Sequence, residues 1–374
     1  MALILGNEDI AQVLDMPECI GALESAYRDH AALRAINRPR TDVYTPHERE
    51  DAFYILKSFE GMLPSAGVAV LRLNSDVIVW SEYAGGIRKD KQPLAGGRWV
   101  GLVLLFSTST GELLAIFPDG VMQRMRVGGT NGIGAKYLAR EDASVYGLLG
   151  AGWQAGGQLM AMAAVRRLKD VRVYSPNPAS REAFAREYGS KLGLPVRPVA
   201  SAREAAEGAD IIGTATSSVQ PLLDPEWLAP GAHITCVKRV ELGDAALARC
   251  QQIVVHSHEG APHNYLVGVG DVPIASHDPL DLMRKVRAGQ AVTEQDITAT
   301  QAHLDALPGE PQLSAVVNGE AAGRTSDRDI NAFVNNIGLG IQFAALGALA
   351  YRKARERGLG RELPGDWFSE DVHP

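Results

Sequence analysis

A glycine-containing turn at residues 150–155 constrains the fold of this 374-residue chain more than any other feature. An apolar run at 145–149 precedes the turn and a helical pattern at 154–168 follows it, so the turn joins a buried strand to a helix. Gly150 suits a tight turn, Gly152 lets the backbone approach a pyrophosphate, and the small residue at 155 allows close helix–strand packing. The turn therefore predicts a dinucleotide site, with the phosphates at the N-terminus of the helix.

Short apolar strands continue to alternate with helices after this turn. Further strands are expected at 171–174, 211–215, 234–237 and 253–255, with helical patterns between most of them. Strands that are connected through helices form a parallel sheet. The pattern therefore predicts an α/β fold with a Rossmann domain, which we place at residues 126–336.

The end of the second strand indicates which dinucleotide is bound. NAD-selective sites usually carry Asp or Glu there, whereas this chain has Ser175 and Asn177, followed by Arg181. No carboxylate would repel a 2′-phosphate, so NADP(H) is favoured over NAD(H). Ligands bind along the carboxyl ends of parallel strands, which adds residues from the later strands. The cofactor-binding candidates are Gly150, Gly152, Trp153, Gln154, Ala155, Ser175, Asn177, Arg181, Thr214, Thr216 and Val237.

The segments on either side of the Rossmann region have a different pattern. Strand-like runs at 53–56, 68–73, 100–106 and 113–117 are separated by turn residues, which is typical of hairpins. A long helical pattern at 338–357 is expected to pack back on this first segment. Residues 1–125 together with 337–374 are therefore predicted to form one discontinuous α+β domain.

Composition and spacing exclude several classes of function. The formal net charge is −7 and no long basic run occurs, which argues against nucleic acid. No apolar stretch reaches the roughly 20 residues needed to span a bilayer, so no membrane partner is expected. Three well-separated cysteines favour a reducing, cytoplasmic location. His256, His258 and His263 match no established zinc spacing, so no metal is expected.

Several stretches resemble the ornithine cyclodeaminase/μ-crystallin family, and the similarity extends over nearly the whole chain. They are 101–106 with 110–112, 126 with 135–140, 147–155, 231–234 and 323–326. The resemblance implies a homodimer, with the discontinuous domain serving substrate binding and dimerisation. It also implies hydride exchange between a nicotinamide and the α-carbon of a small amino or imino acid.

The resemblance further implies roles for individual side chains. Arg126 matches the family arginine that holds the substrate carboxylate, and Arg40 matches a second one. The family usually has a lysine where Ala69 stands. Arg72 lies three positions later and is expected to point to the opposite face of its strand. Lys57, on the preceding strand, is therefore the expected replacement cation. The catalytic candidates are Arg126, Arg40 and Lys57.

Two more departures from the family pattern leave the reaction open. Cyclodeaminases carry an acidic residue just after the strand at 233–237, where this chain has Lys238, and Glu241 matches a different family position. The C-terminal helix normally contains Gln-Asp, whereas Gln342 is followed here by Phe343. These departures disfavour ornithine cyclisation. Lys57, Lys238 and Glu241 all stay candidates for the acid or base.

Three hypotheses follow from this pattern. The primary one is an NAD(P)-dependent oxidoreductase that acts on the C–N bond of a small amino or imino acid, as an imine reductase or an amino-acid dehydrogenase. The first alternative is a non-catalytic NADP(H)-binding partner, or an accessory subunit, of the μ-crystallin kind. The second alternative is an amino-acid cyclodeaminase that recycles tightly bound NAD.

Overall fold

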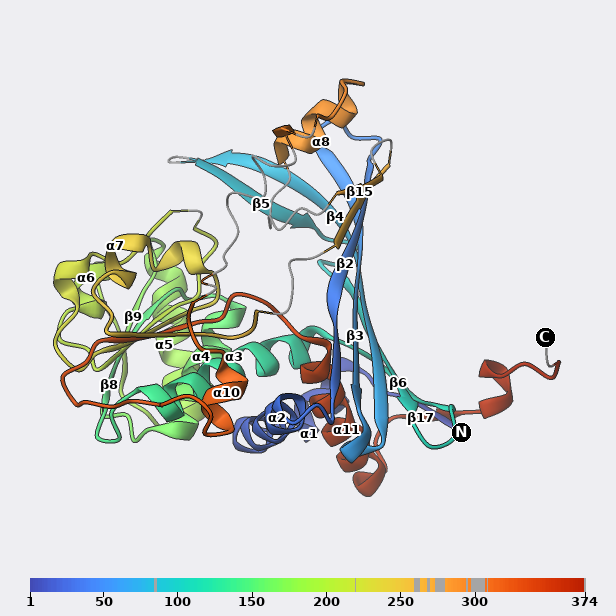
Figure 1. Cartoon of the computed structure of the whole chain (residues 1–374), viewed down its shortest axis with the longest axis horizontal. Helices are drawn as coiled ribbons and strands as arrows, with labels where there is room; N and C mark the ends of the chain where they lie inside the picture. The colour runs from blue at the N-terminus through green and yellow to red at the C-terminus, as the bar shows by residue number, and fades with distance from the viewer. Residues whose placement is uncertain are drawn as a thin grey trace.

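The chain forms two sheets that lie side by side, with helices packed between and around them (Figure 1). The computed structural model describes residues 1–83, 86–218, 220–258, 263–267, 270–272, 280–293, 295–296, 307 and 309–372. Within them, a parallel sheet of seven strands forms the core of one domain, and a longer ten-stranded sheet forms the core of the other.

The seven-stranded sheet has the order β10-β9-β8-β11-β12-β16-β13, and each printed pairing in it is parallel. Helices α4 to α7 connect its strands, which confirms the predicted Rossmann architecture. Strand order reverses beside β8, which makes the β8/β11 junction a topological switch point, the usual ligand position in such sheets. The elements are β8 (Val145–Leu149), α4 (Trp153–Val165), β9 (Asp170–Tyr174), α5 (Pro178–Leu192), β10 (Val196–Pro198), α6 (Ala202–Ala206), β11 (Ile211–Thr214), β12 (His233–Cys236), α7 (Asp244–Leu247), β13 (Gln252–Val255) and β16 (Asn331–Val334).

The ten-stranded sheet is built mainly from antiparallel neighbours, as the hairpin pattern predicts. Its order is β15-β14-β2-β3-β4-β6-β7-β1-β17, with β5 paired to β4. A bulge in β2 shifts the register between Arg38 and Thr41. The strands are β1 (Ala2–Ile4), β2 (Ile36–Pro46), β3 (Ala52–Leu63), β4 (Val68–Tyr83), β5 (Gly86–Gln92), β6 (Val100–Ser107), β7 (Leu113–Pro118), β14 (His263–Leu266), β15 (Gly270–Val272) and β17 (Arg361–Leu363).

One part of the predicted domain division needs correction. Strands β14 and β15 lie inside the 126–336 range assigned to the Rossmann domain, yet β14 pairs with β2 in the larger sheet. The helix α8 (Leu280–Arg287) accompanies them. Leu266, Leu282 and Met283 pack against Tyr44 and Ile55 of the larger sheet. A separate apolar cluster therefore stabilises the position of β14 and α8 on that sheet.

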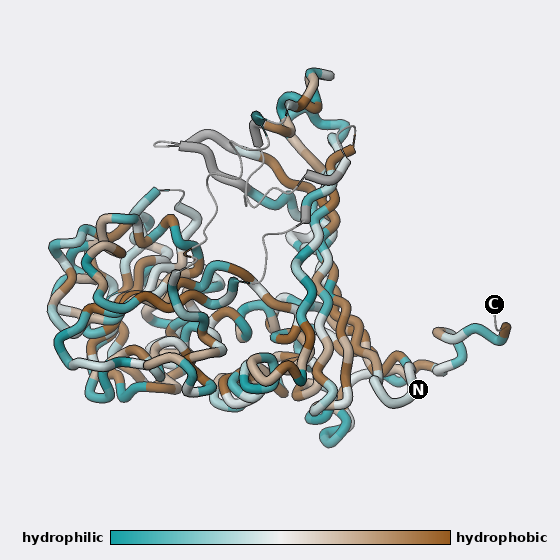
Figure 2. The backbone as a smooth tube through the Cα atoms, viewed as in Figure 1, coloured by the Kyte–Doolittle hydropathy of each residue, from teal (hydrophilic) through white to brown (hydrophobic). Residues whose placement is uncertain are grey.

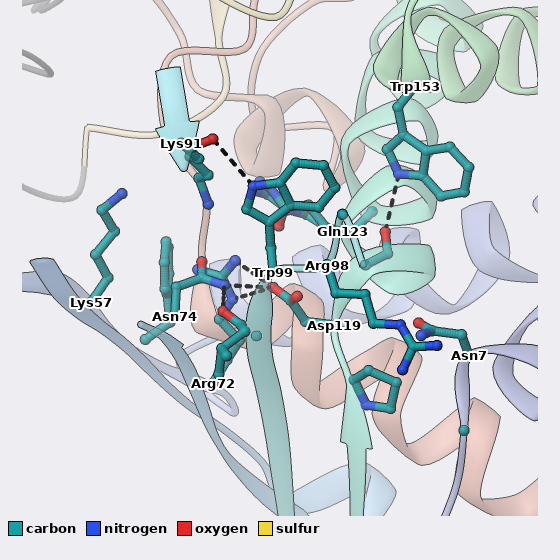
Figure 3. A pocket seen from close by; sticks show the side chains of 18 of the residues that line it. Asn7, Lys57, Arg72, Asn74, Lys91, Arg98, Trp99, Asp119, Gln123 and Trp153 are labelled. Carbon is teal, nitrogen blue, oxygen red and sulfur yellow. Dashed lines mark hydrogen bonds and ion pairs between the residues drawn. The ribbon is translucent and has the colours of Figure 1, made fainter. Parts of the chain in front are cut away.

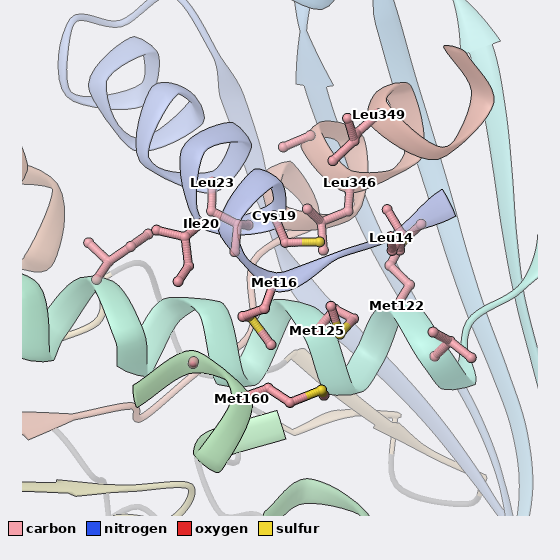
Figure 4. Packing of buried hydrophobic residues seen from close by; sticks show 14 of the residues in the cluster. Leu14, Met16, Cys19, Ile20, Leu23, Met122, Met125, Met160, Leu346 and Leu349 are labelled. Carbon is pink, nitrogen blue, oxygen red and sulfur yellow. The ribbon is translucent and has the colours of Figure 1, made fainter. Parts of the chain in front are cut away.

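Helices lie over one face of the larger sheet. Helix α11 (Gly340–Arg357) packs directly on β2, β3, β4 and β6, and α1 (Asn7–Val13) contacts β7. Helices α2 (Met16–Ala31) and α3 (Gly120–Leu138) pack against α11, and the short α10 (Leu313–Val317) packs beside α2. Figure 4 shows Leu23, Met125 and Leu346 from three of these helices meeting in one core. The α11 helix packs on β3 and β4, as predicted. Its backbone touches β3, where a Cβ added to Gly61 would lie 2.4 Å from the Gly340 carbonyl carbon.

No helix of the described residues lies over the opposite face of the larger sheet. Apolar side chains are exposed at several positions along its strands. In Figure 2, brown, hydrophobic stretches alternate with white and teal ones along these strands. Five of these side chains, each more than a third exposed, are Ile36, Val43, Leu56, Met62 and Leu102. No helix among the described residues is long and apolar enough to cross a membrane.

Candidate active site

The glycine turn after β8 leaves room for a phosphate group. Gly150 has a φ of +123°, and a Cβ there would lie 2.2 Å from the carbonyl oxygen of Ala215. Gly152 begins helix α4 without a side-chain cap, and an added Cβ would meet nothing within 4 Å. Uncapped N–H groups and open space at a helix N-terminus suit an anion. The turn therefore fits the pyrophosphate of a dinucleotide.

The other predicted cofactor contacts gather at the same edge of the sheet. They follow β9, β11 and β12, which neighbour β8 or each other. The hydroxyls of Thr214 and Thr216 both donate to the carboxylate of Glu241, at 3.0 Å and 2.7 Å. Val237 follows directly after β12, and its N–H donates to the Thr214 carbonyl. Glu241, one of the acid/base candidates, is fully buried, and its carboxylate is engaged by the two threonine hydroxyls.

The β9–α5 turn carries no carboxylate side chain. The Asn177 side chain caps α5 by accepting from the N–H of Ser180, and Arg181 donates to the Ser175 carbonyl at 2.8 Å. That contact holds a positive charge beside the turn where the adenosine ribose of a dinucleotide would lie. The side chain of Asn177 therefore caps a helix, a role separate from the cofactor binding predicted for it.

A cavity of about 1100 Å³ separates the larger sheet from the glycine turn. Figure 3 shows Lys57 and Arg72 from β3 and β4 beside it, together with Asp119, which precedes α3, and Trp153 on the Rossmann side. The indole of Trp153 lies 3.6 Å from the Arg124 guanidinium, which anchors it at the start of α4. The Gln154 Oε1 is buried and has no hydrogen-bond partner among the described residues. The cations lining the cavity are Arg40, Lys57, Arg72, Lys91, Arg98 and Arg126.

Arg126 lies on α3 at the inner end of this cavity. Its side chain is buried, and its two hydrogen bonds go to neutral acceptors, Gln123 Oε1 and Gln342 Oε1, each at 3.2 Å. No ion pair between Arg126 and a carboxylate occurs among the described residues. Burial, and then the nearby Arg72, lower the pKa of Arg126 to about 9, so it stays charged at neutral pH. A buried cation without a counterion attracts an anionic ligand.

The two other predicted cations already have carboxylate partners. Arg40 Nε lies 2.8 Å from Asp42, on the same strand. Lys57 Nζ lies 3.5 Å from Asp76, which also contacts Lys91 at 2.8 Å. Of the three acid/base candidates, Lys57 lines the cavity, whereas Lys238 and Glu241 do not. The Lys238 Nζ donates to the Ser218 carbonyl instead.

Arg72 is a site residue that sequence reasoning passed over. The expectation that it points opposite to Ala69 holds, but the opposite face is the one that lines the cavity. There it pairs with Asp119 and lies over the ring of Phe59, 4.9 Å from its centroid. The signal was available, because Arg72, Asn74 and Asp76 recur with a period of two along β4.

The histidines of the sequence analysis do not gather at one point in the described structure. His256 contacts the hydroxyl of Tyr27, and His258 contacts the Glu310 carbonyl. The side chain of His263 lies outside the described residues. Among the residues that are described, no group of His, Cys, Asp or Glu is arranged to hold a metal ion.

Residues 88–358 match the family model described as the ornithine cyclodeaminase/mu-crystallin family. The chain belongs to this family. The family and the Rossmann fold class predicted from the sequence are therefore both confirmed.

Three relatives show how far the similarity extends. A Delta(1)-pyrroline-2-carboxylate reductase of Bacillus cereus is 29% identical over 97% of this chain and 99% of the relative. A putative dehydrogenase of Rhizobium meliloti is 34% identical over 70% of this chain and 72% of its own length. The structure of the Thermococcus litoralis Delta(1)-pyrroline-2-carboxylate reductase, in complex with NADH and L-proline, has a TM-score of 0.72 and 26% identity. It covers 96% of this chain and 100% of that chain.

Proposed function

We propose that this protein reduces the C–N double bond of a small imino acid, whose carboxylate binds Arg126. The protein is an NAD(P)-dependent oxidoreductase of the imino- and amino-acid class, the class to which its named relatives belong. The observation that carries the more specific proposal is the buried guanidinium of Arg126, which faces the cavity and has only neutral partners. A planar guanidinium binds a carboxylate through two parallel hydrogen bonds.

The nicotinamide supplies the hydride when the dinucleotide is bound, and the chain supplies position and charge. Gly150 and Gly152 would receive the pyrophosphate, because their turn leaves the required space. Trp153 follows directly and lines the cavity, so a ligand bound along this turn continues toward Arg126. The reverse oxidation of an amino acid would use the same contacts.

Lys57 is the proposed proton donor to the substrate nitrogen. It lines the cavity, and its Nζ has Asp76 nearby to stabilise the charged form. The reduction consumes one hydride and one proton, and an ammonium group can release the proton as the amine forms. This assignment retains the sequence candidate that faces the substrate space.

The decisive experiment is steady-state reduction of five- and six-membered cyclic imino acids, followed through the absorbance of NADH or NADPH. Arg126→Met should raise KM and lower kcat/KM by about tenfold or more, since a charge-assisted contact contributes roughly 1.5–3 kcal/mol. Arg352→Met, at an exposed cation on α11, is the matched control and should leave kcat/KM unchanged. Unchanged kcat/KM in Arg126→Met would overturn the role of Arg126.

The same assay separates the two alternative hypotheses. A non-catalytic NADP(H)-binding partner would retain cofactor and show no turnover with any imino or amino acid. A cyclodeaminase would release ammonia from a diamino acid with no net change in nicotinamide absorbance. The residue near the end of β12, Lys238, supports neither alternative hypothesis, because it donates to a carbonyl and does not line the cavity.

NADP(H) is the proposed preferred dinucleotide. The support is the β9–α5 turn, where Arg181 is held against the Ser175 carbonyl and no carboxylate side chain is present. Calorimetric titration should give a lower Kd for NADPH than for NADH, and Arg181→Gln should reduce that preference. Tighter binding of NADH to the unaltered protein would contradict the proposal, and NADH is the dinucleotide in the Thermococcus relative.

A homodimer is the proposed assembly. The outer face of the larger sheet presents apolar side chains that no other described element covers, among them Leu56 and Met62 on β3. Monomeric proteins rarely leave a contiguous apolar surface of this kind in water. A second copy of the chain, related by two-fold symmetry, would cover it with the same face.

A further inference from the structure

Behind Arg126, buried polar side chains form one connected group centred on Gln342. The Oε1 atom of Gln342 accepts from Arg126 Nη1 at 3.2 Å and from the Leu339 N–H at 2.9 Å. Its Nε2 donates to Thr130 Oγ1 at 2.7 Å and to the Tyr27 oxygen at 3.0 Å. Both ends of the amide are therefore occupied, and reversing it would place N–H groups against the two donors. The carboxamide is held in one orientation.

The far end of the group is anchored by His256. Its Nδ1 contacts the Ile337 carbonyl, so Nδ1 carries the hydrogen and Nε2 accepts from the Tyr27 hydroxyl at 2.8 Å. Burial lowers the pKa of His256 to about 3, and burial raises the pKa of Tyr27 above its ordinary value. Both side chains are therefore neutral at physiological pH. The whole support behind Arg126 carries no charge of its own.

The group joins elements that are distant in the sequence. Tyr27 comes from α2, Thr130 from α3, Gln342 from the first turn of α11, and His256 from the segment after β13. It therefore crosses from the Rossmann domain to the helices under the larger sheet. Every member is buried, which makes its hydrogen bonds costly to break.

We propose that Gln342 is a positioning residue that holds the Arg126 guanidinium toward the cavity while leaving its charge uncompensated for the substrate carboxylate. A carboxylate at this position would also hold Arg126, but it would compete with the substrate for the same charge. The inference rests on the proposed function and extends it, because it states why the acceptor behind Arg126 is an amide. Tyr27 and His256 act through Gln342 by fixing its orientation.

The test is Gln342→Glu, which keeps the size of the side chain and adds the competing charge. We expect KM for the imino acid to rise by about tenfold or more, with kcat within about threefold and the Kd for NADPH unchanged. Tyr27→Phe removes the hydroxyl that contacts Nε2 and should raise KM by a smaller factor. Tyr146→Phe is the matched control, because the buried Tyr146 hydroxyl has no hydrogen-bond partner among the described residues.

The outcomes separate this inference from the proposed function. A wild-type enzyme that turns over, combined with an unchanged KM in Gln342→Glu, overturns the inference alone. A parallel rise in KM and in the Kd for NADPH also overturns it, because that pattern indicates a general structural defect. If Gln342→Glu does not fold, Tyr27→Phe provides the test instead. A KM of Tyr27→Phe equal to that of the control Tyr146→Phe would then overturn the inference. Wild-type inactivity with every imino acid overturns the proposed function and the inference together.

Discussion

Arg72 and Asp119 form a buried ion pair at the base of the cavity, with Arg72 Nε 2.7 Å from Asp119 Oδ2. The pair explains why Arg72, unlike its neighbour Arg126, is not available to a ligand. Arg72 lies 5.2 Å and Arg126 5.4 Å from the centroid of the same Phe343 ring, so the two cations are neighbours. Asp119 compensates one of them, and the other retains an unpaired charge.

Breaking this pair should cost stability. Asp119→Asn leaves Arg72 charged, buried and next to Arg126, so we expect unfolding free energy to fall by about 3–5 kcal/mol in urea denaturation. Glu207→Gln, which breaks the exposed pair with Arg203, is the control and should leave the unfolding free energy close to that of the wild type, because solvent screens this pair. Equal losses in the two variants would contradict the buried role of the Arg72–Asp119 pair.

Two glycines of the nucleotide turn should respond differently to substitution. Gly152→Asp places a negative charge where the phosphates would bind, and the open space there means that folding should tolerate it. We expect the Kd for NADPH to rise about a hundredfold while Tm stays near that of the wild type. The measurements are calorimetric titration and thermal unfolding.

Gly150→Ala should instead lower stability, because its Cβ would collide with the Ala215 carbonyl and its φ is positive. A fall in Tm is the expected result for this variant. A wild-type Tm in Gly150→Ala would contradict the close approach of Gly150 to the Ala215 carbonyl.

Stability should decline as the medium becomes acidic, and His233 should account for part of the decline. Burial lowers the pKa of His233 to about 3, and neither ring nitrogen has a hydrogen-bond partner among the described residues. The unfolded chain binds a proton near pH 6.5, whereas the folded chain does not, so stability is present above that pH and is lost as pH falls toward 3.

Urea unfolding at pH 7 and pH 5 measures this contribution. His233→Leu should recover about 2 kcal/mol of the loss at pH 5, because leucine takes up no proton. The buried His256 has a similarly low pKa and should provide a second, separate contribution. An identical pH dependence in the wild type and in His233→Leu would show that His233 takes up no proton on unfolding.

The oligomeric state should change when charge is added to the outer face of the larger sheet. Leu56→Glu and Met62→Glu, combined, should convert a dimer to a monomer in sedimentation velocity, because the two-fold contact would bury four carboxylates. Val240→Glu, at a comparably exposed apolar residue in the Rossmann domain, serves as the control. A wild-type monomer, or a dimer unaffected by the double substitution, would contradict the proposed assembly.

The strongly periodic parts of the chain could be predicted from its sequence. Strand β8 and the glycine turn were located because strand, turn and helix signals agree over 145–168. Arg126 was assigned through family resemblance, and its surroundings in the structure suit that role. The structure adds that its acceptors are uncharged, which depends on contacts such as the one with Gln342, 216 positions away in sequence.

Other parts could not be inferred from local pattern. Strand β14 pairs with β2, and its four residues do not by themselves indicate which sheet they join. Arg72 was misjudged for a different reason. Alternation gives the relative direction of two side chains on a strand, but only packing decides which face is the interior.

The return of α11 and β17 to the N-terminal segment has a consequence for biosynthesis. Strand β17 pairs with β1, and Phe343 on α11 packs against Phe59 of β3, with ring centroids 5.7 Å apart. The N-terminal part of the larger sheet therefore lacks its covering helix until α11, much later in the chain, has been synthesised. Strands β8 to β12 of the Rossmann sheet can pair before α11 is made, whereas β13 joins the sheet only through the later strand β16. Nascent chains of this protein should consequently expose an apolar sheet until α11 has left the ribosome, and chaperones should bind them during that interval.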